Sequence, residues 1–162
     1  MQDDQVPDPT NPWGHFASFH IQRSARAMAL TMAIELEAFD LRPSEATILC
    51  MIDRNPGISQ ASISKMIATR RPNISPITRE LHRRGLIERG TLVGRNLGWS
   101  VTEPGKITSQ RINAIVRRNE RQMLDALPPA MREGFMEALR SCGVSFLDRL
   151  RKLKPDISLT LE

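Results

Sequence analysis

The 162-residue chain has no tyrosine, and only 4% of its residues are aromatic. Because large β-sandwich cores are rich in aromatic side chains, this scarcity argues against such a fold. No apolar run approaches the roughly 18 residues that a membrane-spanning helix needs. The N-terminus also lacks a basic stretch followed by an apolar one, so we expect no secretory signal. These absences predict a cytoplasmic protein.

Groups suited to catalysis or metal binding are also scarce. The three histidines are not spaced as metal ligands, no glycine-rich phosphate loop follows a strand, and no serine has the setting of a nucleophile elbow. We therefore predict no enzyme activity, no metal and no cofactor. Cys50 and Cys142 lie far apart in helical patterns and are interpreted as buried thiols rather than a disulfide. A redox-responsive role for either cysteine is the alternative.

Positive charge is concentrated in one stretch. Between Ser59 and Arg95 there are eight basic and two acidic residues, a net charge of +6, whereas the whole chain carries +5. Such a concentrated cluster attracts polyanions, which favours a nucleic acid as partner. A basic helical adaptor that binds acidic proteins is the alternative, and the steep salt dependence of DNA binding would separate the two. The basic residues are Lys65, Arg70, Arg71, Arg79, Arg83, Arg84, Arg89 and Arg95.

Apolar residues recur at intervals of three and four along most of the chain, which predicts a mainly α-helical fold with a small β-hairpin. Breaks are marked by Asn55-Pro56-Gly57, by Gly85 and by Pro128-Pro129. We expect helices at about 13–39, 43–54, 59–68 and 102–127. Another helix should follow a short turn at 69–71 and end near residue 84, and a last one should follow Pro128-Pro129 and end near residue 153. Strands are expected at about 86–89 and 97–101. The first helix has an apolar stripe made of Phe16, Phe19, His20, Arg23, Ala27, Leu30 and Ile34. In the last helix, the residues expected to face inward are Phe135, Leu139, Phe146 and Leu150.

The order of a short helix, a tight turn and a basic second helix is how many proteins place a helix in the major groove of DNA. The helix at 59–68 is expected to hold the next one against the core, leaving the other face of that second helix free. Asparagine and arginine side chains are well shaped to bond adenine and guanine edges. Pro76 should bend this helix unless the helix begins late. The predicted base readers are Asn73, Ser75 and Arg79, and the predicted phosphate or minor-groove contacts are Ser59, Gln60, Arg70, Arg71, Arg83 and Arg95.

Three stretches resemble the MarR (multiple antibiotic resistance regulator) family: residues 41–61, the run ITRELHRRGLIER at 77–89, and Val101-Thr-Glu-Pro-Gly105. The resemblance implies a winged helix-turn-helix lobe at 41–102 and dimerisation helices at 13–40 and 103–153, between an N-terminal arm at 1–12 and a tail at 154–162. It also implies a homodimer on a palindromic operator, usually a repressor released by a small ligand. One departure is Val93, which stands where the family's wing has an aspartate that orients the wing arginine, here Arg95.

A ligand site is predicted on the first helix. His20 and Arg23 share its stripe with Phe16 and Phe19. A buried arginine needs an anionic partner. A carboxylate ligand flanked by aromatic rings would provide one, so we expect a small aromatic acid or its thioester as effector. The alternative is that Arg23 pairs with an acidic residue of a partner chain.

Overall fold

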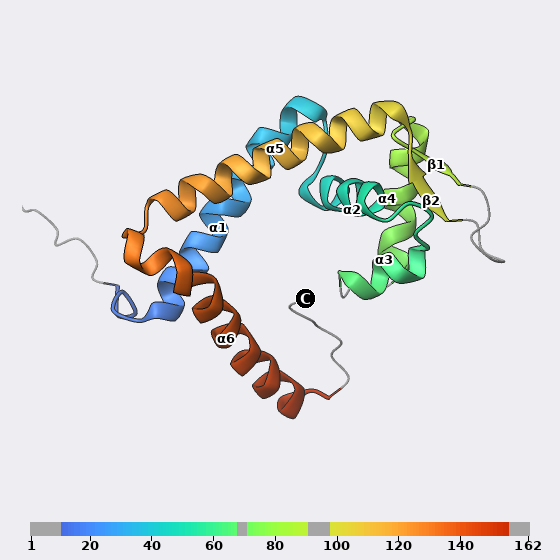
Figure 1. Cartoon of the computed structure of the whole chain (residues 1–162). Helices are drawn as coiled ribbons and strands as arrows, with labels where there is room; N and C mark the ends of the chain where they lie inside the picture. The colour runs from blue at the N-terminus through green and yellow to red at the C-terminus, as the bar shows by residue number, and fades with distance from the viewer. Residues whose placement is uncertain (1–10, 68–70, 91–97, 156–162) are drawn as a thin grey trace, which may run out of the picture.

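The structure, a computed structural model that describes residues 11–67, 71–90 and 98–155, is mainly helical with one small antiparallel hairpin, as predicted (Figure 1). The long helix α5 links a compact lobe at one end of the molecule to α1 and α6 at the other, so that the chain forms an open arc. The elements in order are α1 (Ala17–Leu36), the 3-10 helix η1 (Glu37–Phe39), α2 (Pro43–Arg54), α3 (Gln60–Met66), α4 (Arg71–Arg83), β1 (Ile87–Arg89), β2 (Trp99–Val101), α5 (Glu103–Asp125) and α6 (Pro129–Leu153).

Local signals explain where several elements begin and end. Ser59 caps α3 because its hydroxyl accepts from the Ser62 N–H (3.0 Å), and Thr102 caps α5 by accepting from the Gly105 N–H (3.2 Å). Gly85 follows α4 with a φ of 68°, a conformation that glycine adopts without strain. Helix α4 runs from Arg71 to Arg83, so Pro76 lies inside the helix and does not end it.

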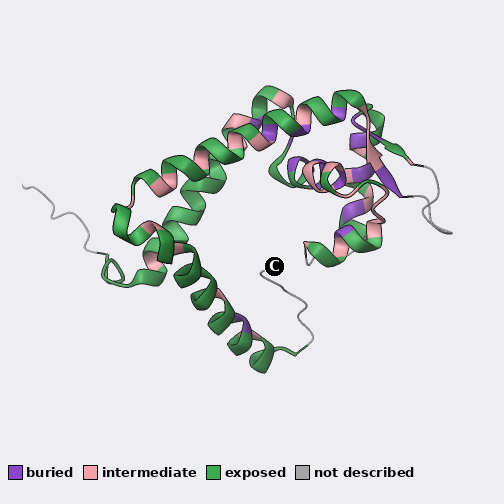
Figure 2. Ribbon diagram, in the orientation of Figure 1, coloured by how far each residue is buried: buried purple, intermediate pink, exposed green. Residues whose placement is uncertain are grey.

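The hydrophobic core lies in the lobe and not in the middle of the arc. Figure 2 shows buried residues gathered over α2, α3, α4, the hairpin and the adjoining half of α5. Ile48, Leu49 and Ile52 of α2 are fully buried at its centre. Each such side chain contributes roughly 1.5–3 kcal/mol to stability, so this lobe is the best-anchored part of the chain. The other buried apolar residues of this core are Leu36, Leu41, Ala46, Ile63, Ile74, Leu81, Leu86, Ile87, Trp99 and Ile112.

Two glycines allow backbones to pass close together within the lobe. A Cβ at Gly105 would overlap the carbonyl oxygen of Leu86, and one at Gly98 would overlap that of Gly57. The hairpin pairs Ile87 with Val101. The start of α5 therefore lies directly against the hairpin.

The apolar stripes of α1 and α6 were expected to be buried, but in the single chain most of their residues are exposed. Phe16, Leu30 and Ile34 are exposed, as are Leu139 and Phe146 of α6, because within the described residues α6 makes only sparse contacts with other elements. Arg23 and His20 are exposed too, so the expectation of a buried arginine is wrong for the isolated chain. Phe19, Phe135 and Leu150 are half-buried, and in α6 it is Leu147 that is buried. No helix in the described part of the chain has the length and apolarity needed to span a bilayer.

Candidate nucleic-acid interface

Helix α4 is held against α3 by both apolar and polar contacts. Ile63 of α3 and Ile74 and Leu81 of α4 are fully buried between the helices and the rest of the lobe. The Gln60 side-chain amide donates to the Thr78 hydroxyl (2.7 Å), and Thr78 is itself completely buried. Sequence reasoning missed Thr78, because its role depends on a partner 18 residues away. These contacts fix α4 with its opposite face outward.

The outward face of α4 exposes two of the three predicted base readers to solvent, although the Arg79 Nε–H also donates to the Ser75 carbonyl (3.4 Å). Asn73 and Arg79 are exposed. Ser75 is half-buried, and its hydroxyl donates to the Gln60 side-chain oxygen (3.4 Å). Ser75 and Gln60 therefore belong partly to the contact between α3 and α4, and Ser59 uses its hydroxyl to cap α3. Contacts of these three residues with DNA remain predictions.

Arg83 is exposed but paired within its own helix. Its guanidinium donates twice to the Glu80 carboxylate (2.8 and 2.6 Å). The hydrogen bond from Arg83 lowers the pKa of Glu80, and the same bond raises the pKa of Arg83. Part of the basic charge of the lobe is therefore balanced locally. Of the other predicted contacts, Arg70 and Arg95 lie outside the described residues, and Arg71 is the first residue of α4.

The hairpin is attached to the lobe through Trp99. This side chain is buried, and its backbone N–H donates to the Ile58 carbonyl (2.9 Å), next to the start of α3. The Arg89 guanidinium lies 4.5 Å from the centroid of the indole ring, and the His82 ring lies 5.5 Å from it. One ring nitrogen of the exposed His82 lies 2.9 Å from the Ile87 carbonyl oxygen, so the imidazole joins α4 to β1.

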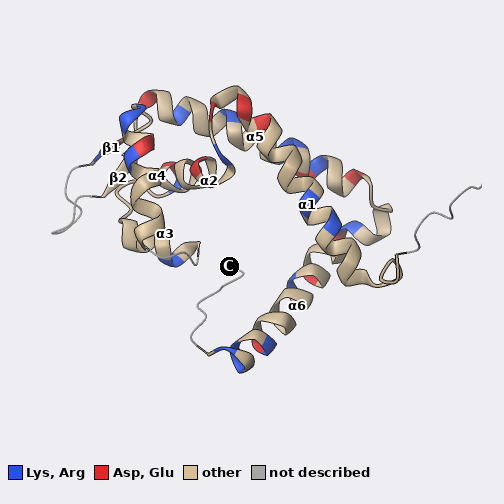
Figure 3. Cartoon of the chain, turned by 180° about the vertical axis from the view of Figure 1, so that it is seen from behind, with Lys and Arg blue, Asp and Glu red and all other residues tan. Residues whose placement is uncertain are grey.

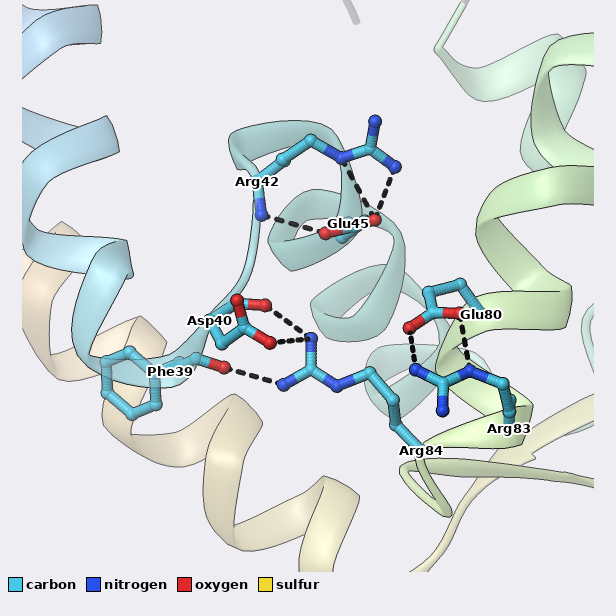
Figure 4. A network of polar contacts seen from close by, with 7 residues as sticks. All are labelled: Phe39, Asp40, Arg42, Glu45, Glu80, Arg83 and Arg84. Carbon is cyan, nitrogen blue, oxygen red and sulfur yellow. Dashed lines mark hydrogen bonds and ion pairs between the residues drawn. The ribbon is translucent and has the colours of Figure 1, made fainter.

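A polar network lies where the lobe meets α1. Arg84, just after α4, donates to the carbonyls of Phe39 (2.7 Å) and Asp40 at the end of η1 (Figure 4). At the start of α2, the buried Glu45 carboxylate accepts from the backbone N–H of Arg42 (2.8 Å) and from its guanidinium. Burial opposes ionisation of Glu45, but these bonds outweigh it and lower its pKa. A cavity of about 700 Å³ opens beside this network.

A second cavity, of about 670 Å³, lies between α2 and α5 and contains both acidic and basic side chains. The Ser109 hydroxyl donates to the Asp53 carboxylate (2.8 Å), and the Cys50 thiol lies 3.9 Å from the Ser109 carbonyl oxygen. Desolvation by burial is the main cause that raises the pKa of Cys50. Cys142 is exposed on α6, which corrects the prediction that it is buried. The cavity is lined by Thr47, Cys50, Met51, Asp53, Arg54, Asn55, Met66, Asn113 and Arg117.

The predicted ligand residues on α1 lie together but do not line either cavity. The Arg23 guanidinium stands over the Phe19 ring at 5.5 Å, and the Phe19 and His20 rings meet edge to face at 5.6 Å. The His20 Nε2 atom is hydrogen-bonded to the Gly14 carbonyl (2.8 Å). Phe16 is the N-cap residue of α1, directly before these side chains, and half of its surface is exposed. The structure thus forms a cationic and aromatic surface cluster at the end of α1 far from the lobe.

Basic residues are spread over more than the lobe. Figure 3 shows Lys and Arg near the hairpin and at the end of α3, and also along α5 and at the end of α6. Among the described residues, no group of His, Cys, Asp or Glu is arranged to hold a metal ion.

Comparisons with known proteins identify what the chain resembles. Residues 41–92, which contain α2, α3, α4 and β1, match the model of the MarR family. No curated protein matches the sequence. The crystal structure of the transcriptional regulator SlyA superposes with a TM-score of 0.71 at 21% identity, covering 85% of this chain and 98% of SlyA.

Two other solved structures were determined with bound molecules. The MepR–DNA complex of S. aureus superposes with a TM-score of 0.70 at 21% identity, covering 80% of this chain and 97% of MepR. The Mycobacterium tuberculosis MarR family protein Rv2887 in complex with p-aminosalicylic acid gives a TM-score of 0.62 at 22% identity, covering 78% of this chain and 98% of that protein. The chain therefore has the fold of these regulators along most of its described length.

Proposed function

We propose that this chain is a transcription regulator of the MarR family and not an enzyme, and that it represses transcription by binding a palindromic operator as a homodimer. The observation that carries the proposal is the exposed face of α4. It displays Asn73 and Arg79 to solvent while Thr78 and Ile74 hold the opposite face in the core. A helix held in this way can enter a major groove without rearranging the lobe.

The proposed dimer is supported by the exposed apolar surfaces of α1 and α6. A soluble monomer rarely exposes large contiguous apolar areas, whereas obligate dimers bury more than about 2,000 Å² of such surface. A second copy would cover these faces and place two α4 helices about 34 Å apart, one helical turn of DNA. The exposed apolar side chains at this end of the arc are Trp13, Phe16, Ile21, Met28, Leu30, Ile34, Met131, Met136, Leu139, Val144, Phe146 and Leu153.

Substitutions of two arginines of α4 distinguish recognition of base sequence from electrostatic attraction to any DNA. We expect Arg79→Ala to reduce the preference for operator over random duplex by about 1–3 kcal/mol, because a guanidinium that bonds a base edge discriminates between bases. Arg83→Ala should weaken binding to both duplexes by the same small factor, since Glu80 already balances its charge. Titrations of both variants at several salt concentrations measure this.

Equal losses for the two variants on both duplexes would contradict this division of roles. Wild-type protein with no preference for a palindrome and little salt dependence would instead favour the protein-binding adaptor, because DNA affinity falls steeply with salt.

The proposed effector is a small aromatic acid. The surface cluster of Phe16, Phe19, His20 and Arg23 offers a guanidinium beside aromatic rings, which suits a ring that bears a carboxylate. Rv2887, which shares the fold, has been solved with salicylic acid. A partner chain packed on α1 would shield the cluster from solvent and strengthen these contacts.

Release of operator DNA by salicylate tests this site. Arg23→Ala should abolish release, whereas Arg26→Ala, which removes an exposed arginine from the next turn of α1, should leave it unchanged. If salicylate still releases DNA from the Arg23 variant but not from an Arg117→Ala variant, the effector binds in the cavity between α2 and α5 and the assignment to α1 is wrong.

A further inference from the structure

Arg84 joins two parts of the molecule that are distant in the sequence. Its backbone N–H donates to the Glu80 carbonyl (3.0 Å), so its main chain continues the last turn of α4. Its side chain crosses to the end of η1, where the two terminal nitrogens of the guanidinium donate to the carbonyls of Phe39 and Asp40 (Figure 4). One side chain therefore connects the helix proposed to enter DNA with the end of the first dimerisation helix.

The two carbonyls are available because of how α1 and η1 end. Asp40 has a left-handed φ of 52°, and its N–H donates to the Glu37 carbonyl (2.9 Å) while the Leu41 N–H reaches back to Leu36 (3.4 Å). This closing turn leaves the last carbonyls without helical donors, at the negative end of the helix dipole. The planar fork of a guanidinium can bond both carbonyls at once, which a lysine ammonium matches poorly.

Backbone contacts rather than an ion pair hold Arg84. The Asp40 carboxylate is 3.8 Å from the guanidinium and 98% exposed, so water screens it strongly. The Arg84 side chain itself is only 21% exposed. Glu45 and Glu80 line the same cavity, but each is paired with another arginine. Arg84 therefore has a well-defined position that does not depend on one exposed acid.

The end of α1 is also attached to α5, so the carbonyls that Arg84 contacts belong to a segment held in place by two helices. Glu35 accepts hydrogen bonds from Arg118 and from the Asn119 side chain (2.6 Å). The Arg111 guanidinium stands 5.0 Å from the centre of the Phe39 ring. Because α5 and α1 are joined here, a change in the angle of α4 relative to this point would require the Arg84 contacts to break.

We propose that Arg84 is a positioning residue that sets the angle between α4 and α1 and thereby selects the half-site spacing of the operator. This inference rests on the proposed DNA-binding function. Helix α4 has 13 residues and is about 20 Å long, so a tilt of roughly 10° at Arg84 moves its far end by about 3.5 Å, close to the rise of one base pair. A small increase in the range of angles between α4 and α1 would therefore let the dimer accept half-sites at more than one spacing.

The test measures affinity for a set of palindromes whose central spacer is up to two base pairs shorter or longer than the optimum. For wild-type protein we expect a penalty of about tenfold for one extra base pair, and for Arg84→Ala a penalty of about twofold or less. Arg84→Lys, which keeps the charge but loses the fork, should fall between them. Thermal unfolding of each variant checks that the fold is retained.

Arg83→Ala is the matched control, because it removes an equal charge from the preceding residue without touching η1. It should lower affinity by one factor at every spacing and leave the spacer profile unchanged. A profile of Arg84→Ala that is parallel to the wild type, or identical to that of Arg83→Ala, would overturn the inference. If Arg84→Ala does not fold, the Arg84→Lys profile decides in the same way. Failure of wild-type protein to prefer any palindrome would instead contradict the proposed function.

Discussion

Cys50 shows how the surroundings of a single residue decide its chemistry. The thiol lies half-buried between α2 and α5, with the Ser109 carbonyl as its polar neighbour (3.9 Å). Burial raises the pKa of this thiol, and the nearby Asp53 acts in the same direction. Because the thiolate is the reactive form, a raised pKa keeps Cys50 in its unreactive state at neutral pH. This argues against Cys50 as a redox sensor.

We expect Cys50 to react slowly with a maleimide in folded protein that carries Cys142→Ala. Denaturant should speed labelling by at least about tenfold, because unfolding exposes the thiol and returns its pKa to the ordinary range. Mass spectrometry after timed labelling measures the rate, and a Cys50→Ala variant reports Cys142 alone. Equally fast labelling in native and denaturing buffer would mean that Cys50 is accessible in the folded protein.

At the scale of elements, the pairing of α3 with α4 decides how the DNA-facing side chains are presented. Helix α3 has only seven residues and α4 contains Pro76, so neither is expected to be stable alone. Their stability comes from the buried isoleucines and from the hydrogen bond between Gln60 and Thr78. A buried polar pair of this kind also fixes the rotation of one helix against the other.

Thr78→Val should therefore lower the free energy of unfolding by about 1–3 kcal/mol, because the Gln60 amide loses its partner in a buried place. Chemical denaturation followed by circular dichroism measures the change. Thr108→Val is the matched control, since among the described residues its hydroxyl donates to the Pro104 carbonyl of its own helix (2.8 Å) and to no other element. Similar losses in the two variants would show that the bond from Gln60 adds nothing to the lobe.

At the scale of the whole molecule, the lobe has a hydrophobic core, whereas the described residues at the other end of the arc do not form one. The lobe buries its isoleucines and leucines completely, whereas α1 and α6 leave most of theirs exposed (Figure 2). The proposed homodimer resolves this imbalance, because a second copy would cover the far end. It also implies that DNA affinity depends on protein concentration through assembly.

Phe146→Glu should convert the dimer into a monomer, because a carboxylate at a side chain that is now 67% exposed would be desolvated in the interface. Analytical ultracentrifugation measures the mass, and operator affinity should fall together with it. Gln110→Glu adds the same charge to an exposed site at the lobe end of α5 and should leave the dimer intact. A dimer that survives the Phe146 change would contradict a central role of α6 in assembly.

Features that depend on near neighbours along the chain could be predicted from the order of residues alone. Helix limits follow from Ser59, Gly85 and Thr102, the mainly helical class follows from apolar spacing, and the basic cluster is visible in the order of residues. Caps, turns and amphipathic faces involve residues within about one turn of each other, so they can be predicted without coordinates.

Which distant groups contact each other could be learned only from the folded chain. The bonds from Gln60 to Thr78 and from Arg84 to Phe39, and the exposure of α1 and α6, depend on how helices far apart in the chain pack together. An apolar stripe predicts that a helix face will be buried but not which surface buries it. A basic residue predicts a positive charge but not which group pairs with it. Packing chooses among those options, because each polar group is satisfied only by what the fold brings near it.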